Sequence, residues 1–282
     1  MSEAHPLSPG PALSFPQGTV SAFHFALPMA LWSRRTLVLG LLGGALPLMA
    51  VVFLTVKSIP AAEIRTPGYI FFSNAFQFIL YYVLLTALAM GTAVIAEEID
   101  GRTLTYLTIR PVPKAALLLG KAAAAWTTGA ILVAATVVSG YTVFTLGDGL
   151  LFSGGADSFL INLPTLGVDL LLTLGALAVY ITVFTFIGAR FARPMLWGIT
   201  LAFGWESWVA FVPGLTRKLT AMHYIQSLSP HASGRNAAVA LLQQGAGRLE
   251  SVVALALILA AFALLAAWTF SRREYEFDLS KR

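Results

Sequence analysis

The chain has 282 residues, of which 57% are hydrophobic and only 11% are charged, and its mean hydropathy is +0.79. A soluble domain carries about 25% charged residues, so this composition excludes an ordinary soluble protein and predicts a multi-pass membrane protein. The absence of cysteine excludes disulfides and thiolate nucleophiles, and the net charge of +5 reports membrane topology rather than nucleic-acid binding.

The N-terminal stretch is rich in proline and serine. Residues 1–18 have little to bury and are predicted to be a disordered tail, and without a basic n-region they do not form a signal peptide. Residues 19–35 place apolar side chains at roughly helical spacing and end in two arginines. We expect an amphipathic helix lying in the cytoplasmic interface, the other interpretation being the start of the first spanning helix. A cleaved signal sequence at 36–56 is disfavoured because that run is too long and starts too late.

Six stretches are long and apolar enough to span a membrane, which takes about 20 residues. They are roughly 36–56, 70–96, 117–146, 169–189, 194–212 and 251–271. The fifth is the weakest, because Glu206 interrupts it and Pro213 ends it. With six spans and both ends inside, twelve of the 18 lysines and arginines lie inside, as the positive-inside rule requires. The predicted fold class is an all-α membrane protein with six transmembrane helices, an N-terminal interfacial helix and both termini cytoplasmic.

Two connecting segments are assigned to the outer side. Residues 147–168 are glycine-rich, carry no base and are predicted to be a loop. Residues 213–250 are longer, and their apolar spacing predicts one short amphipathic helix from Leu215 to Ile225 and another from Ala237 to Gln244. The whole transmembrane domain is predicted to cover residues 19–275, followed by a cytoplasmic tail at 276–282.

The densest group of charges lies in a short loop at 97–114. Residues 66–96 and 122–147 carry no charge, yet three acids and four bases lie between these stretches. Glu97, Glu98 and Asp100 fall at the C-terminal end of the second predicted span, where the helix dipole disfavours each acid by about 0.3–1 kcal/mol. Helix stability therefore does not explain these acids, and the loop is interpreted as a membrane-surface segment that contacts a soluble partner.

The sequence lacks the motifs of a self-sufficient enzyme. No G-x-x-x-x-G-K-[ST] motif occurs, because Ala115 stands where the first glycine would precede Gly120 and Lys121, so the chain should not bind ATP through a P-loop. H-E-x-x-H and Gly-x-Ser-x-Gly are also absent. We expect a non-catalytic chain that holds no metal or cofactor itself. A membrane-embedded enzyme would need a cluster such as Glu206, His223 and Asp169.

Four polar side chains in the predicted spans are candidates for a substrate path. Glu206 lies about 18 Å from the start of its span at 1.5 Å per residue. A charge near the bilayer centre costs about 2.5–3.5 kcal/mol, so Glu206 either lines a path or proton relay, or is a structural or snorkelling side chain. Asn74, Gln77 and Tyr81 share one face of the second span and would line a path or a helix contact.

The loop sequence Glu-Glu-x-x-Gly-Arg-Thr-Leu-x-x-Leu, followed by proline and lysine, resembles ABC-2 type transporter permeases. The resemblance covers most of residues 20–275 and is closest to the bacterial branch of the nitrous-oxide-reductase maturation permease and of sodium or drug efflux permeases. It implies that the loop is a coupling helix that docks on a separate ATP-binding subunit. The coupling residues implied are Glu97, Glu98, Gly101, Arg102, Thr103, Leu104, Leu107, Pro111 and Lys114. The second and fifth spans would then face a partner permease and the path, which fits Asn74, Gln77 and Glu206.

This resemblance predicts a permease subunit of an ABC exporter in the cytoplasmic (inner) membrane. Two copies, or one copy with a related chain, would assemble with two ATPase subunits that bind ATP and Mg²⁺. The same loop would serve a membrane anchor or scaffold that recruits an ATPase without transport, and a membrane-embedded enzyme is the third interpretation. Aromatic-rich spans suit lipids, drugs or peptides as substrates, and a polar substrate is the alternative.

Overall fold

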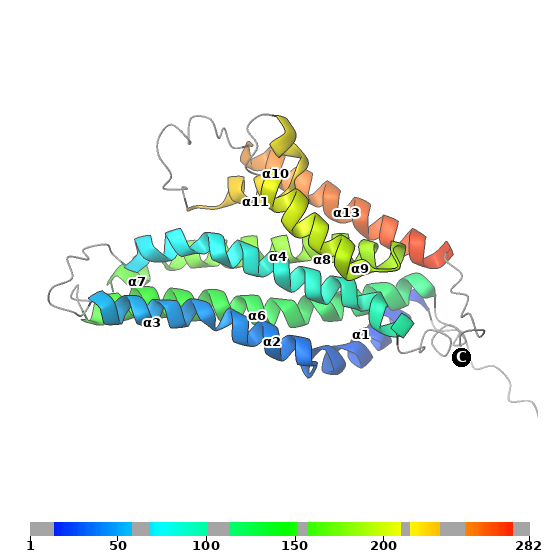
Figure 1. Cartoon of the computed structure of the whole chain (residues 1–282), viewed down its shortest axis with the longest axis horizontal. Helices are drawn as coiled ribbons and strands as arrows, with labels where there is room; N and C mark the ends of the chain where they lie inside the picture. Colours follow the sequence, from blue (N-terminus) through cyan, green and yellow to red (C-terminus); the bar gives the residue numbers. More distant parts are fainter. Residues whose placement is uncertain are drawn as a thin grey trace, which may run out of the picture.

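The computed structural model describes residues 14–57, 68–100, 113–151, 157–209, 215–231 and 246–272, and every regular element within them is a helix. The long helices lie side by side along the molecule (Figure 1). We call the end at which α1, the last turn of α4 and the start of α6 lie the α1 end, and the opposite end, where α7 lies, the α7 end.

Helix α1 (Phe15–Leu31) begins inside the stretch that was predicted to be a disordered tail. The backbone N–H of Ser14 donates to Gln17 Oε1 at 3.2 Å, and a proline in the first turn suits the start of a helix. The prediction is therefore wrong for residues 15–18. Helix α1 packs along the start of α6, where a Cβ at Gly120 would collide with the Thr19 carbonyl oxygen.

The first long apolar segment consists of two helices, α2 (Arg34–Gly43) and α3 (Ala45–Lys57), which meet at Gly44. Ser33 separates α2 from α1, and its hydroxyl accepts a hydrogen bond from the backbone N–H of Thr36 at 3.3 Å. The two arginines that were assigned to the end of the N-terminal helix thus open the next one.

Three long helices form the centre of the bundle: α4 (Gly68–Asp100), α6 (Lys114–Leu151) and α8 (Leu163–Arg190). Their largest fully buried side chains are aromatic, among them Phe72, Phe76, Tyr141, Phe144, Tyr180 and Phe184. Helices α4 and α8 approach closely at Gly91, where a Cβ would lie 2.9 Å from the Ile181 carbonyl oxygen. Large aromatic side chains and a small residue at the crossing together pack these helices tightly.

The predicted outer loop at 147–168 is largely helical. Helix α6 continues to Leu151, α7 covers Asp157–Ile161, and α8 begins at Leu163. Gly147 lies against Leu54 of α3, so its small size serves helix packing rather than a turn. The Tyr141 hydroxyl of α6 donates to the Phe159 carbonyl at 2.7 Å, which ties α7 to the bundle.

The fifth apolar stretch is helical but irregular. It consists of α9 (Pro194–Ile199), a π-helical segment η1 (Thr200–Glu206) and α10 (Ser207–Val209). The outer segment predicted as one helix is divided into a 3₁₀ turn, η2 (Leu215–Leu219), and α11 (Ala221–Leu228). The division falls at Thr220, whose hydroxyl accepts from the His223 N–H and so begins α11. The outer helix predicted at 237–244 lies outside the described residues.

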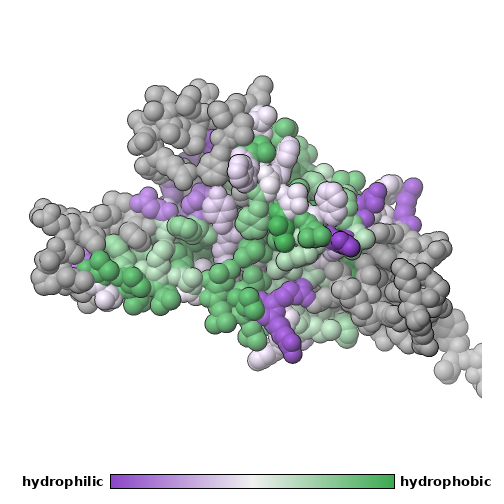
Figure 2. Space-filling view, in the orientation of Figure 1, coloured by the Kyte–Doolittle hydropathy of each residue, from purple (hydrophilic) through white to green (hydrophobic). Residues whose placement is uncertain are grey.

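Within the described part of the chain, five helical segments are long and apolar enough to cross a membrane: Arg34–Lys57, Phe72–Ile95, Lys114–Gly147, Leu163–Arg190 and Arg248–Arg272, the last in α13 (Arg248–Arg272). They coincide with the first, second, third, fourth and sixth predicted spans, whereas residues 194–209 are not among them. Figure 2 shows a broad hydrophobic face over α3 and the helices beside it. The chain is therefore a multi-pass membrane protein of helices.

Candidate functional site

The coupling candidates lie at the α1 end, where α4 ends and α6 begins. Glu97 and Glu98 belong to the last turn of α4, which the structure describes by its backbone and not by its side chains. Lys114 is the exposed first residue of α6. The remaining candidates lie outside the described residues: Gly101, Arg102, Thr103, Leu104, Leu107 and Pro111.

Glu206, at the end of η1, is buried, with 5% of its surface exposed, and it binds the first turn of α11. Its carboxylate accepts backbone hydrogen bonds from Ala221 at 3.2 Å and Met222 at 2.9 Å, and a third from the Tyr180 hydroxyl at 2.9 Å. These N–H groups have no partner within their own helix, and a carboxylate at a helix N-terminus is stabilised by the helix dipole. The contacts identify Glu206 as the anchor of α11.

The other path candidates have different surroundings. Gln226 of α11 donates from Nε2 to Gln77 Oε1 of α4 at 3.4 Å, so Gln77 also holds α11. Asn74 is exposed on α4, and Tyr81 is partly buried. The structure therefore separates the four candidates: two contact α11, and two face outward or into a groove.

That groove has a volume of about 320 Å³ and opens between α2, α3, α4, α6 and η1. Leu46, Phe78, Tyr81 and Phe203 contribute to its walls, and none of the described residues that line it is charged. The groove brings residues of the second and fifth predicted spans together.

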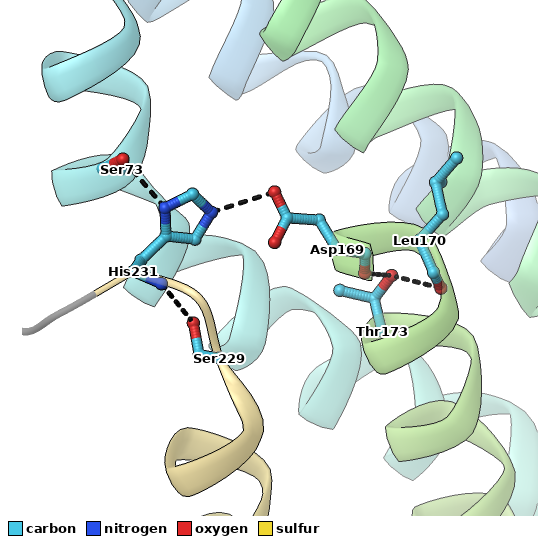
Figure 3. A network of polar contacts seen from close by, with 6 residues as sticks. All are labelled: Ser73, Asp169, Leu170, Thr173, Ser229 and His231. Atoms are coloured by element: carbon cyan, nitrogen blue, oxygen red, sulfur yellow. Dashed lines mark hydrogen bonds and ion pairs between the residues drawn. The ribbon is translucent and has the colours of Figure 1, made fainter. Parts of the chain in front are cut away.

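A second polar network joins the segment after α11 to two long helices (Figure 3). His231 Nε2 lies 2.9 Å from Asp169 Oδ2 of α8, and His231 Nδ1 lies 2.8 Å from Ser73 Oγ of α4. Asp169 is buried, and its other oxygen, Oδ1, has no hydrogen-bond partner. The ring of His231 packs on Phe76 with centroids 4.6 Å apart. The network thus fastens the chain at His231 to the α7 end of the bundle.

The contacts Ser73–His231–Asp169 follow the order of a nucleophile, a base and an orienting carboxylate in serine hydrolases. Hydrolysis needs substrate access, but the side chains of His231 and Asp169 are only 4% and 1% exposed. The cluster suggested for an enzyme is not assembled either, because Glu206 binds Tyr180 and α11 while Asp169 binds His231. We interpret the network as a structural connection.

His223 of α11 is buried, and neither ring nitrogen has a hydrogen-bond partner. Burial lowers the pKa of His223 below its ordinary value, and the nearby charges of Arg217 and Lys218 lower it further. The imidazole is therefore held neutral at physiological pH. Among the described residues, no group of three or more histidine, aspartate or glutamate side chains is arranged to hold a metal ion.

Sequence reasoning missed Tyr180, Ser73 and His231 as parts of these networks. Ser73 and Tyr180 lie within apolar stretches, which is a signal that their polar groups need partners, whereas His231 lies in the segment 213–250 and carries no such signal. The sequence does not say which helices are neighbours, so the partners could not be named.

Comparison with known proteins identifies the family. A family model described as ABC-2 family transporter protein matches residues 31–205, from the last residue of α1 to the residue before Glu206, which is more than half of the chain. No curated protein matches the sequence. The matched region contains α2, α3, α4, α6 and α8, whose packing makes the membrane bundle. The chain therefore belongs to the ABC-2 family of transporter proteins.

Proposed function

We propose that the chain is the permease subunit of an ABC exporter and that a separate ATPase subunit binds ATP and Mg²⁺. Family membership supports the role in a transporter, and the lack of a P-loop motif in the sequence supports a second chain as the ATPase. The motif from Glu97 to Leu107 favours the branch that includes the nitrous-oxide-reductase maturation permease. We further propose an assembly of two permeases, identical or related, with two ATPases.

One observation carries the coupling role: α4 continues as a single helix beyond its apolar segment. It has 33 residues and so a length of about 50 Å, compared with about 30 Å for the hydrocarbon core. Its apolar segment ends at Ile95, and the acidic turn with Glu97 and Glu98 follows. Because the helix dipole disfavours acids at this position, contact with a partner surface is the better explanation for them.

The proposed topology has six spans with both termini in the cytoplasm. The segment from α9 to α10 supplies the fifth span, and it starts near the end of α8 and leads toward the outer helices (Figure 1). The positive-inside rule supports placing the α1 end in the cytoplasm, since Arg34, Lys114 and Arg190 all lie there. This arrangement directs the α4–α6 connection toward a cytoplasmic ATPase.

In the proposed mechanism, ATP-driven closure of the ATPases pushes on the α4–α6 connection. Helices α4 and α6 transmit the movement rigidly, because they are continuous from the α1 end into the core. The groove containing Tyr81 and Phe203 lies where the second and fifth spans meet and would form part of the substrate path. Its apolar walls favour an apolar or amphipathic cargo.

The test is a double substitution, Glu97→Ala with Glu98→Ala, in the assembled complex. We expect weaker co-purification of the ATPase and at least a tenfold loss of coupled transport. Glu250→Ala is the matched control, because Glu250 is an exposed acid at the start of α13, paired with Lys218 across 3.5 Å. Unchanged co-purification and transport in the double variant would refute the coupling role. Retained ATPase binding by a wild-type complex that transports nothing would favour an anchor instead.

A further inference from the structure

A second apolar groove, distinct from the proposed substrate path, lies between α8 and α13. Its volume is about 320 Å³, and its two long walls are one face of residues 171–179 of α8 and one face of residues 252–259 of α13. Leu228, the last residue of α11, also lines it. Every described residue that lines the groove is leucine, valine, alanine or glycine. The groove is as large as a small-ligand site, and its apolar walls disfavour water as the occupant.

The groove lies along the part of α13 that the protein packs least. The buried residues of α13 are Ser251 near its start and three residues in its last two turns, so residues 252–265 between them include none that is buried. On the α8 side, a Cβ at Gly175 would meet no atom within 4 Å. The middle of α13 therefore leaves space beside α8, and the dispersion contacts missing there are available to a molecule that surrounds the helices.

We propose that an acyl chain of a membrane phospholipid lies in this groove. Both walls belong to segments that are long and apolar enough to cross a membrane, so lipid rather than water surrounds them. The α8 wall runs from residue 171 to residue 179 and is about 12 Å long, which is most of the depth of one leaflet, about 15 Å. A flexible hydrocarbon chain of that length restores the dispersion contacts that an empty groove lacks.

Arg248, at the start of α13, can bind the phosphate of the same lipid. It lies four residues before Val252, so its side chain is on the face of α13 that lines the groove, one turn nearer the end of the helix. Helix α13 is about 38 Å long and the hydrocarbon core is about 30 Å thick, so the ends of the helix reach the membrane surfaces. Arg248 is exposed, and none of the described residues forms an ion pair with it. Its guanidinium is therefore suited to a phosphate, which it can bind through two N–H groups.

The bound lipid would join three elements of the fold. Its chain would contact α8 and α13 along the groove and α11 at Leu228. The acid nearest to Arg248 in the sequence, Glu250, does not oppose the phosphate, because it pairs with Lys218 across 3.5 Å. The proposal requires only that α8 and α13 lie in the membrane, and it does not depend on transport or on an ATPase.

The experiment uses phosphatidylcholine that carries a photoreactive diazirine in the middle of one acyl chain. The purified protein is reconstituted with this lipid in nanodiscs and irradiated, and the labelled peptides are mapped by mass spectrometry. Two variants fill the groove: Gly175→Leu from α8 and, from the other wall, Ala256→Leu, since Ala256 is an exposed lining residue. Gly167→Leu is the matched control, because a Cβ at Gly167 also meets no atom within 4 Å and Gly167 does not line the groove.

We expect the label to concentrate in residues 171–179 and 252–259 of the wild type and to fall there about tenfold in Gly175→Leu. Ala256→Leu should lower it in the same way, which keeps the test valid if Gly175→Leu fails to fold. Gly167→Leu should be labelled like the wild type. Arg248→Gln should reduce the label in the groove about fivefold, whereas Arg193→Gln, which changes another exposed arginine, should not.

Three outcomes would overturn the proposal. The first is label spread equally over all the spans, because lipid would then coat the protein without a preferred site. The second is unchanged label in the groove of both filling variants. The third is a wild-type groove without label together with filling variants that lose a dimer on size-exclusion chromatography, because a second copy of the chain would then cover the groove. Diacylglycerol with the same photoreactive chain should label the groove about fivefold less than phosphatidylcholine, and equal labelling would refute the phosphate contact at Arg248.

Discussion

Replacing Glu206 tests whether this buried acid anchors α11 or lines a substrate path. Glu206→Ala removes both oxygens that accept from Ala221, Met222 and Tyr180. A buried donor left without a partner costs about 1–3 kcal/mol, so three such donors set an upper range of about 3–9 kcal/mol. The Tyr180 hydroxyl can rotate and α11 can move toward water, so we expect a loss of about 3–5 kcal/mol in the free energy of unfolding.

Two further substitutions should lower the free energy of unfolding by smaller amounts. Glu206 Oε2 accepts two of the three hydrogen bonds, so Glu206→Gln can keep both with its remaining oxygen and lose only the one from Ala221. We expect a loss of about 1–2 kcal/mol for this variant. Tyr180→Phe removes a donor without leaving another unpaired and should cost about 1 kcal/mol. The predicted order of destabilisation is therefore Glu206→Ala, then Glu206→Gln, then Tyr180→Phe.

The assay is denaturant unfolding of the purified permease in one detergent, with transport measured on the same variants. Glu250→Ala is the control, because its exposed ion pair with Lys218 should contribute less than about 1 kcal/mol. If Glu206→Ala unfolds at the wild-type midpoint while transport is lost, Glu206 belongs to the path and the anchoring role is refuted.

Three other predictions concern His231, His223 and the packing of α1. His231→Ala leaves the fully buried Asp169 without its ring partner and should cost about 3–5 kcal/mol in the same unfolding assay, whereas a loss below 1 kcal/mol would contradict the pairing. Because the folded state lowers the pKa of His223, the unfolded state binds a proton more readily, and stability should fall as the pH drops from 7 through about 6.5 and below. His223→Leu should flatten this loss between pH 7 and 5, and parallel curves would refute the assignment. Gly120→Leu should displace α1 from α6 and speed its proteolysis, while Gly167→Leu, which meets open space, should not.

The long helices were predictable because the lipid environment demands uninterrupted apolar runs. The predicted stretch 70–96 lies within α4, and the predicted 251–271 lies within α13. The ends of the helices were less predictable, because glycine and proline are typical of loops but also occur inside helices or in their first turn. Gly147 suggested a loop, but its small size allows α6 to pack against Leu54. Pro16 suggested disorder, but it lies in the first turn of α1.

The candidate networks were harder to predict than the helices. The sequence marked Glu206 as a polar residue that needs an explanation, but its three donors come from α8 and from the start of α11. Asp169 and His231 are 62 positions apart, and no local pattern pairs them. Such partners depend on which helices are neighbours, and that is a property of tertiary packing rather than of sequence spacing.

The irregular fifth stretch and helix α11 are best understood as one unit. The helical segment from Pro194 to Val209 is shorter than the about 20 residues of a typical span, and it ends close to an acid whose charge would cost about 2.5–3.5 kcal/mol near the bilayer centre. In the proposed six-span topology, the backbone N–H groups of Ala221 and Met222 offset this cost only when α11 is docked on Glu206. In that topology, placement of the fifth stretch in the membrane and docking of α11 are coupled, so a substitution in either element should weaken both.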